Sequence, residues 1–70
     1  MAVTVDARGL RCPLPLIKAK LALEEMAAGE TVVVLATDPE ASIDLAAWAA
    51  DAGHSFREKA TGEYELRKKG

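Results

Sequence analysis

Apolar residues along this chain alternate between the spacing of a strand and that of a helix, and this alternation limits the fold more than any other feature. Residues 2–6 are short, β-branched and alternating, which predicts a strand. Residues 31–36 are continuously apolar, which predicts a strand that is covered on both faces or central in its sheet. Residues 54–60 and 63–69 predict two strands joined at Thr61-Gly62. Three large side chains of this hairpin are expected to face inward: Phe56, Tyr64 and Leu66.

Two segments between these strands have helical periodicity. The first runs from Pro13 to Ala28, and we expect Gly29 to end it. The second follows Thr37-Asp38-Pro39-Glu40, in which Asp38 is expected to cap the helix, and Gly53 ends it. The positions expected to be buried on the first helix are Leu16, Ala19, Leu23 and Met26. Those on the second helix are Ala41, Leu45, Trp48, Ala49 and Ala52.

The order of these elements is strand, helix, strand, helix, strand, strand. Right-handed crossovers place both helices on the same face of the sheet. The sequence therefore predicts an α/β chain of the α+β type, a two-layer sandwich with two helices on one face of a four-stranded mixed sheet. A chain of 70 residues has room for one domain, so we expect residues 1–70 to form a single one.

Composition and charge exclude several classes of protein. The net charge of -2 gives no general attraction to nucleic acid, and the basic cluster Arg67, Lys68 and Lys69 is a weak signal. The longest apolar stretch is far shorter than the roughly 20 residues that a membrane-spanning helix needs. The N-terminal segment lacks the pattern of a secretion signal, and one cysteine cannot form an internal disulfide. We therefore expect a cytoplasmic protein with no direct contact to nucleic acid or membrane. We also expect a monomer, although no feature of the sequence fixes the oligomeric state.

The single cysteine, Cys12, lies in the segment Gly9-Leu10-Arg11-Cys12-Pro13-Leu14-Pro15, between the first strand and the first helix. We expect Cys12 at the N-cap and Pro13 at the first helical position. Free N–H groups and the helix dipole favour an anion there, and Arg8 and Arg11 are close in sequence. These features predict a lowered pKa of the Cys12 thiol and a nucleophilic sulfur.

Other kinds of chemistry have little support in the sequence. No His with Asp or Asn is arranged to make Cys12 a protease-like nucleophile, and no glycine-rich phosphate loop is present. His54 lacks partners at the spacing of metal ligands. We therefore expect no metal and no organic cofactor.

Four features together resemble the TusA/SirA family of sulfur carriers over essentially the whole chain: the segment 9–15, which looks like the family's Cys-Pro-x-Pro signature, Thr37-Asp38-Pro39, Asp44 and Gly53-His54. The resemblance implies a β-α-β-α-β-β sandwich similar to the C-terminal domain of translation initiation factor three. It also implies that Cys12 carries a sulfane sulfur as a persulfide. The donor would be a cysteine desulfurase or a rhodanese-like enzyme, and the acceptor a protein with a reactive cysteine.

The acceptors of such carriers serve tRNA thiolation, molybdenum-cofactor maturation or sulfur oxidation, and the sequence does not choose among them. The resemblance implies a transfer partner more than a turnover enzyme. The lack of a second cysteine suits a carrier, because a neighbouring thiol would release the sulfur as a disulfide forms. A redox regulator that forms mixed disulfides at Cys12, or a nucleic-acid-binding module that uses the basic C-terminal cluster, are the alternatives.

Several neighbours of Cys12 are candidate site residues. Arg11 is expected to stabilise the thiolate or persulfide, or to contact a partner. Leu14 is apolar where other family members can have a charged side chain, and with Ile43 it could form a small docking patch. The residues expected to contact a partner are Pro13, Leu14, Pro15 and Asp38.

Overall fold

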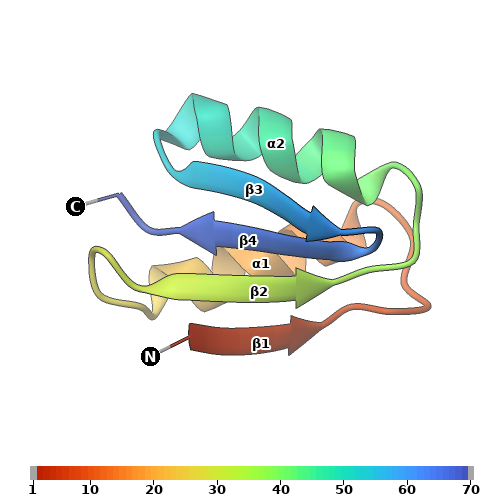
Figure 1. Cartoon of the computed structure of the whole chain (residues 1–70), viewed down its shortest axis with the longest axis horizontal. Coiled ribbons are helices and arrows are strands. Elements are labelled where there is room, and N and C mark those ends of the chain that lie inside the picture. Colours follow the sequence, from red (N-terminus) through yellow and green to blue (C-terminus); the bar gives the residue numbers. More distant parts are fainter. Residues whose placement is uncertain (1, 70) are drawn as a thin grey trace.

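The computed structural model describes residues 2–69, in which four strands and two helices form two layers (Figure 1). The predicted order of strands and helices is confirmed, and the strands end within one or two residues of their expected limits. Residues 1 and 70 of the predicted single domain lie outside the described residues. The elements are β1 (Ala2–Asp6), α1 (Leu14–Glu24), β2 (Thr31–Leu35), α2 (Ala41–Ala52), β3 (Ser55–Ala60) and β4 (Glu63–Arg67).

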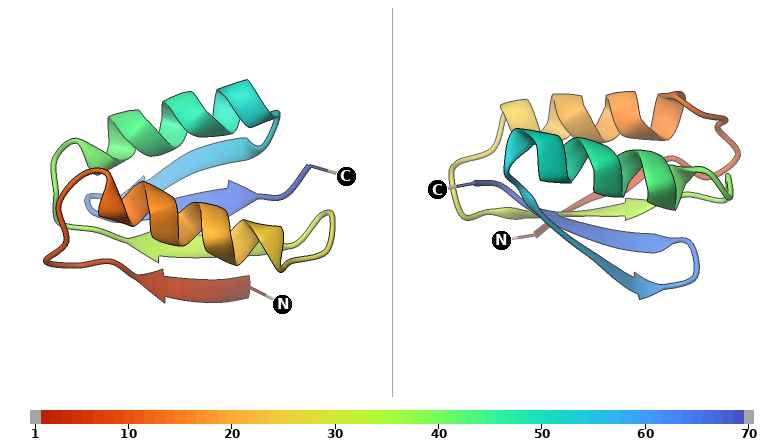
Figure 2. Two further views of the ribbon diagram at one scale, coloured as in Figure 1. Left: turned by 180° about the vertical axis from the view of Figure 1, so that it is seen from behind. Right: turned by 90° about the horizontal axis from the view of Figure 1, so that it is seen from above.

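The sheet has the order β1-β2-β4-β3, with β1 parallel to β2 and the other neighbours antiparallel. Both helices cover the same face, as the view from above shows (Figure 2). This arrangement confirms the predicted α+β two-layer sandwich with a mixed sheet. The central position expected for β2 is right, but its coverage on both faces is wrong, because Val32 and Val34 are buried while Val33 is half-buried on the open face.

The core lies between the sheet and the two helices. Alternation along the strands turns one set of side chains toward the helices, and helical spacing turns one face of each helix toward the sheet. The expected inward side chains of β4, Tyr64 and Leu66, are buried, and Phe56 of β3 is partly buried against them. The fully buried larger side chains are Pro15, Leu23, Val32, Val34, Leu45 and Leu66.

The first helix is shorter than predicted at its C-terminal end. It stops at Glu24, and Glu25 is its C-cap. The backbone N–H of Ala27 donates to the carboxylate of Glu30 at 2.7 Å, so it is bound outside the helix. Gly29 therefore does not end the helix, and instead its N–H donates to the carbonyl of Lys68 at 2.9 Å. Sequence periodicity could not predict the hydrogen bond between Ala27 and Glu30, because it shows only which positions are apolar.

Three loops meet at one end of the sheet, namely those that follow β1, β2 and β3 (Figure 1). The N–H of Ala36 donates to the carbonyl of Gly62 in the β3–β4 turn at 3.0 Å. Gly62 has a φ of +78°, and a Cβ there would lie 2.8 Å from the Ala36 oxygen. Only glycine allows this close approach, which fixes where the loop after β2 begins. In the described part of the chain, no helix has the length and apolar character needed to cross a membrane.

Candidate functional site

Two loops carry the candidate site, the segment 7–13 after β1 and the segment 36–40 after β2. Because β1 and β2 are parallel, these loops leave the same end of the sheet. The N–H of Gly9 donates to Thr37 Oγ1 at 2.9 Å, and the N–H of Cys12 donates to Asp38 Oδ2 at 2.6 Å. The second loop therefore holds Cys12 in place through its backbone.

Asp38 does not cap α2, which corrects the sequence-based expectation. The N-cap of α2 is Glu40, without a side-chain cap, because Asp38 lies before the helix. Asp38 Oδ1 accepts the N–H of Glu40 at 2.9 Å, while Oδ2 accepts that of Cys12. These bonds from Glu40 and Cys12 hold the pKa of the Asp38 carboxyl below its usual value. Asp38 thus joins the two loops.

Replacing Asp38 with alanine should loosen this junction. Two backbone N–H groups would lose their acceptor, so we expect the melting temperature at neutral pH to fall by about 5 °C. Because folding lowers the pKa of this carboxyl, its contribution is present above the unfolded pKa of about 4 and is lost as the pH falls below it. The difference between wild type and variant should therefore shrink in acid. Asp51→Ala, an exposed change near the end of α2, is the control for thermal melts.

The structure places Cys12 one residue before the N-cap of α1, and not at the N-cap itself. The carbonyl of Pro13 accepts the N–H of Ile17 at 3.0 Å, so Pro13 is the N-cap of α1 and Leu14 is its first residue. The expected placement of Cys12 at the N-cap and Pro13 inside the helix is wrong, because Cys12 is held by Asp38 instead. The Cys12–Pro13 peptide bond is cis, and the Cys12 side chain is exposed.

The Cys12 thiol faces carboxylates and not cations. Its Sγ donates a hydrogen bond to Asp44 Oδ2 in the first turn of α2. This bond, followed by partial desolvation and the charges of Asp44, Glu40 and Asp38, raises the pKa of Cys12 to about 11. The predicted lowering of the thiol pKa is therefore wrong.

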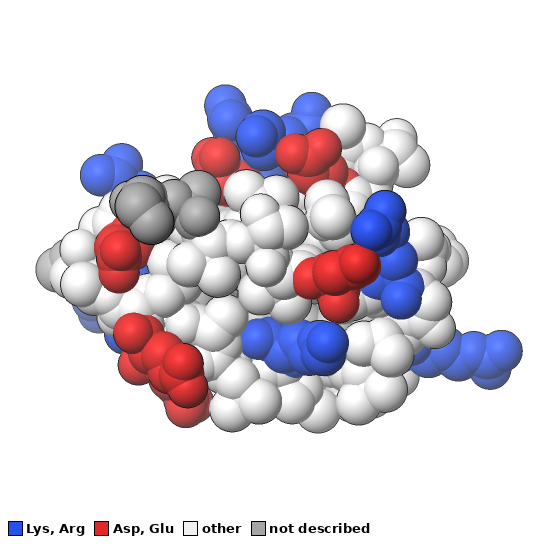
Figure 3. Space-filling model, turned by 90° about the horizontal axis from the view of Figure 1, so that it is seen from below, with Lys and Arg blue, Asp and Glu red and all other residues white. Residues whose placement is uncertain are grey.

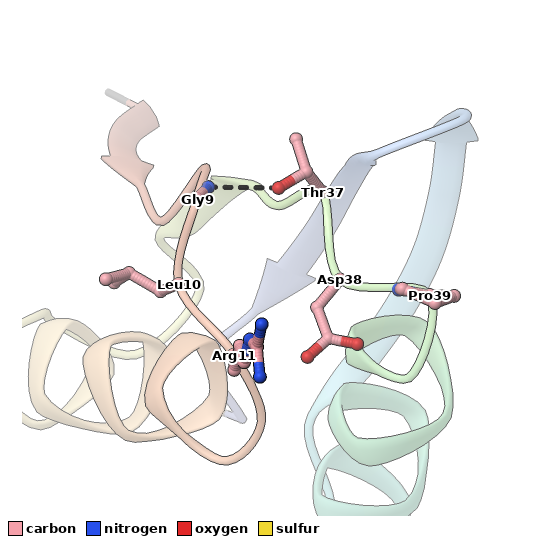
Figure 4. A pocket seen from close by; sticks show the side chains of 6 residues that line it. All are labelled: Gly9, Leu10, Arg11, Thr37, Asp38 and Pro39. Atoms are coloured by element: carbon pink, nitrogen blue, oxygen red, sulfur yellow. Dashed lines mark hydrogen bonds between the residues drawn. The ribbon is translucent and has the colours of Figure 1, made fainter.

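The two arginines that suggested a low thiol pKa act elsewhere. Arg8 forms an ion pair with Asp6 at 2.9 Å. The guanidinium of Arg11 points toward the Asp38 carboxylate across a pocket of about 360 Å³ (Figure 4), and its charge helps to lower the pKa of Asp38. Arg8 and Arg11 are close to Cys12 in sequence, but the charges that act on its sulfur are those of carboxylates. The pocket is lined by Gly9, Leu10, Arg11, Thr37, Asp38 and Pro39.

The donor atoms of Cys12, Glu40 and Asp44 all lie within 4.8 Å of one another, a spacing that could also hold a metal ion. Exposed acidic groups commonly lie this close without an ion. Here the thiol hydrogen bond already links two of the three groups. The expectation that the protein uses no metal stays a prediction.

The residues expected to contact a partner differ in exposure. Pro13 is exposed, and Leu14 is 47% exposed at the start of α1. Ile43, next to Asp44 on α2, is 68% exposed. Pro15, the second residue of α1, is fully buried, so its side chain is not available to a partner in this conformation. The first turn of each helix therefore carries an exposed apolar side chain.

Comparison with known proteins identifies the family. A family model described as Sulfurtransferase TusA matches residues 3–69. The chain belongs to the TusA family. The SirA-like protein of Desulfitobacterium hafniense, whose crystal structure is known, is similar to this chain with 38% identity and a TM-score of 0.73. The match covers 94% of this chain and 92% of that one, which supports the whole two-layer fold.

Two relatives show how the TusA-family domain occurs in proteins of different length. The sulfur carrier protein TusA of Allochromatium vinosum is 43% identical over 54 residues, which cover 77% of this chain and 71% of that protein. YrkF of Bacillus subtilis is 41% identical over 54 residues, which cover 77% of this chain but only 29% of YrkF. The domain can thus be a small part of a longer chain.

Proposed function

We propose that this protein is a sulfur carrier, which takes up a sulfane sulfur as a persulfide on Cys12 and passes it to an acceptor protein. The observation that carries the proposal is an exposed, sole cysteine in the Cys-Pro-x-Pro segment of a TusA-family chain, held at a loop junction by Asp38. An exposed sulfur is accessible to another protein. A single cysteine cannot discharge its persulfide into an internal disulfide.

Both halves of the relay are exchange reactions at sulfur. The Cys12 thiolate attacks the outer sulfur of a donor persulfide, and the donor's S–S bond breaks as its electron pair leaves on the donor cysteine. The new S–S bond makes Cys12 a persulfide. An acceptor thiolate then attacks the outer sulfur, and the electron pair of the broken bond returns to Cys12. No electrons are gained or lost overall, so neither an oxidant nor an organic cofactor is needed.

The partners that fit this chemistry are a cysteine desulfurase or rhodanese-like donor and an acceptor with a reactive cysteine. Each must reach the Cys12 sulfur, so each must cover the surface beside it. The exposed apolar side chains of Leu14 and Ile43, together with Pro13, support a docking surface there. The acceptor would serve tRNA thiolation, molybdenum-cofactor maturation or sulfur oxidation.

The alternatives have weaker support. A redox regulator needs a thiolate that oxidants can attack in the free protein, where the pKa of Cys12 is raised, whereas a carrier needs the thiolate only in the complex with its donor. A nucleic-acid-binding module needs a continuous basic surface, whereas acidic and basic groups are interspersed on the face seen from below (Figure 3). The net charge of -2 points the same way.

Intact mass spectrometry under non-reducing conditions tests the proposal. The wild-type protein is incubated with a cysteine desulfurase and cysteine, and we expect a species heavier by one sulfur atom. The added sulfur should be removed by a thiol reductant. Prior alkylation with iodoacetamide should block its addition, because Cys12 is the sole cysteine. An adduct that still forms on the alkylated protein, or no adduct on the free protein, contradicts the proposal.

A further inference from the structure

Asp44 reaches the Cys12 sulfur from the neighbouring helix, although the two residues are 32 positions apart in sequence. We infer that Asp44 is a positioning residue for sulfur transfer, whose carboxylate keeps the Cys12 sulfur protonated and pointing in one direction in the free protein. This inference rests on the proposed function and deepens it. If Asp44 has this role, the hydrogen bond between Cys12 and Asp44 must break before the Cys12 sulfur can attack a donor.

The backbone fixes both ends of this hydrogen bond. On one side, the N–H of Cys12 donates to Asp38 Oδ2 at 2.6 Å, which prevents the cysteine from moving with a free loop. On the other side, Asp44 is half-buried in the first turn of α2, where its own N–H donates to the carbonyl of Glu40 at 3.0 Å. An exposed thiol ordinarily turns among its rotamers. Here the fixed acceptor selects one direction.

The charges that face the sulfur all disfavour its thiolate. Asp44 and Glu40 lie at the start of α2, and Asp38 lies on the loop before it. Arg11, on the loop that carries Cys12, acts on Asp38. The neutral thiol is therefore the stable form of the free protein at neutral pH, and an exposed sole cysteine is protected from oxidation. A cationic group beside the partner's reactive sulfur would weaken the hold of Asp44 when the two proteins meet.

The pH dependence of Cys12 alkylation by iodoacetamide, measured in the presence of EDTA, tests the role of Asp44. In Asp44→Asn we expect the alkylation profile to move to lower pH. Asp44 is the first of several causes that raise this pKa, and desolvation, Glu40 and Asp38 remain in the variant, so the pKa should fall by less than the full two units and the thiolate fraction should rise by less than about 100-fold. The less basic thiolate is also less nucleophilic, by up to about tenfold. The net rate at neutral pH should therefore rise by up to about tenfold.

Two further variants show whether the carboxylate itself is responsible. Asp44→Glu keeps a carboxylate and should keep the slow wild-type reaction. Asp51→Asn removes the same charge from the far part of α2 and should leave the profile unchanged. Circular dichroism checks that each variant is folded. An Asp44→Asn profile that matches the wild type would overturn the inference, as would an Asp51→Asn profile that shifts equally.

The rates at which oppositely charged methanethiosulfonates react with Cys12 give a second, independent measure of the electrostatic potential at its sulfur. The Cys12 thiolate attacks the reagent's divalent sulfur, a disulfide forms, and methanesulfinate leaves with the electron pair. In wild type we expect the trimethylammonioethyl reagent to react faster than the sulfonatoethyl reagent, and Asp44→Asn should reduce this ratio severalfold. A ratio that does not change on substitution contradicts the inference.

The two proposals fail in different experiments. If sulfur loading from the desulfurase fails but Asp44→Asn shifts the alkylation profile, the sulfur-carrier proposal falls and Asp44 still holds the thiol. If loading succeeds but the profile does not shift, the role of Asp44 falls and the carrier proposal remains.

Discussion

Replacing Cys12 with serine should abolish both sulfur loading and onward transfer while leaving the fold intact. A serine oxygen cannot form a persulfide, and the chain has no second cysteine to replace the lost thiol. Serine is nearly the same size and can still donate a hydrogen bond to Asp44. Transfer of radioactive sulfur from cysteine, through a desulfurase and this protein to an acceptor, should therefore fall to the background of the assay.

The melting temperature separates loss of chemistry from loss of structure. Cys12 is exposed and contributes nothing to the core, so the melting temperature of Cys12→Ser should stay within about 2 °C of wild type. Sulfur transfer that persists in this variant at the wild-type rate would show that the protein acts on sulfur without carrying it. A large drop in melting temperature would instead mean that Cys12 supports the fold.

Hydrophobic periodicity was sufficient to predict the layers of the fold. The apolar character of β2 predicted its central position in the sheet, although only one of its faces is fully buried. The helical spacing around Leu23 and Leu45 predicted that these side chains leave water, and both are buried. The limits of α1 depend on particular hydrogen bonds. Glu30 binds Ala27 from beyond the helix, and such a bond leaves no trace in the apolar pattern.

The location of the candidate site was predictable, but its electrostatics were not. The segment around Cys12 singled out the sulfur that we propose as the carrier, because proline residues close to a helix start are local features of the sequence. The pKa of the thiol depends on charges close in space, and Asp44 comes from the next helix. The parallel pairing of β1 and β2 brings their following loops together, so the acidic residues at the start of α2 were the sequence signal for charges that reach Cys12.

The hydrogen bonds of Asp38 and Asp44 give the site two separate requirements. Asp38 binds the Cys12 backbone and so needs the loop after β2 to be in place. Asp44 binds the sulfur and so needs the first turn of α2 to be in place. Both requirements depend on how firmly α2 is packed on the sheet, which connects the reactivity of Cys12 to the core beneath it.

Leu45 anchors that helix, and Leu45→Ala should destabilise the protein more than any surface change. The Leu45 side chain is fully buried and directly follows Asp44. Leucine-to-alanine changes in cores cost about 2–5 kcal/mol. A single core of this size supplies only about 3–5 kcal/mol of net stability. Much of the Leu45→Ala protein should therefore be unfolded near 37 °C, and its Cys12 alkylation should be faster because the hydrogen bond to Asp44 is lost with the fold.

Ile43→Ala is the matched control, because it removes an aliphatic side chain from the same helix at a position that is 68% exposed. Its cost should stay within about 0.5 kcal/mol, as for most surface substitutions. Urea denaturation followed by the fluorescence of Trp48, the sole tryptophan, measures both variants. Equal losses in the two variants would mean that α2 packs through a different face. A large loss confined to Leu45→Ala would show that the helix carrying Asp44 is held to the sheet by this side chain.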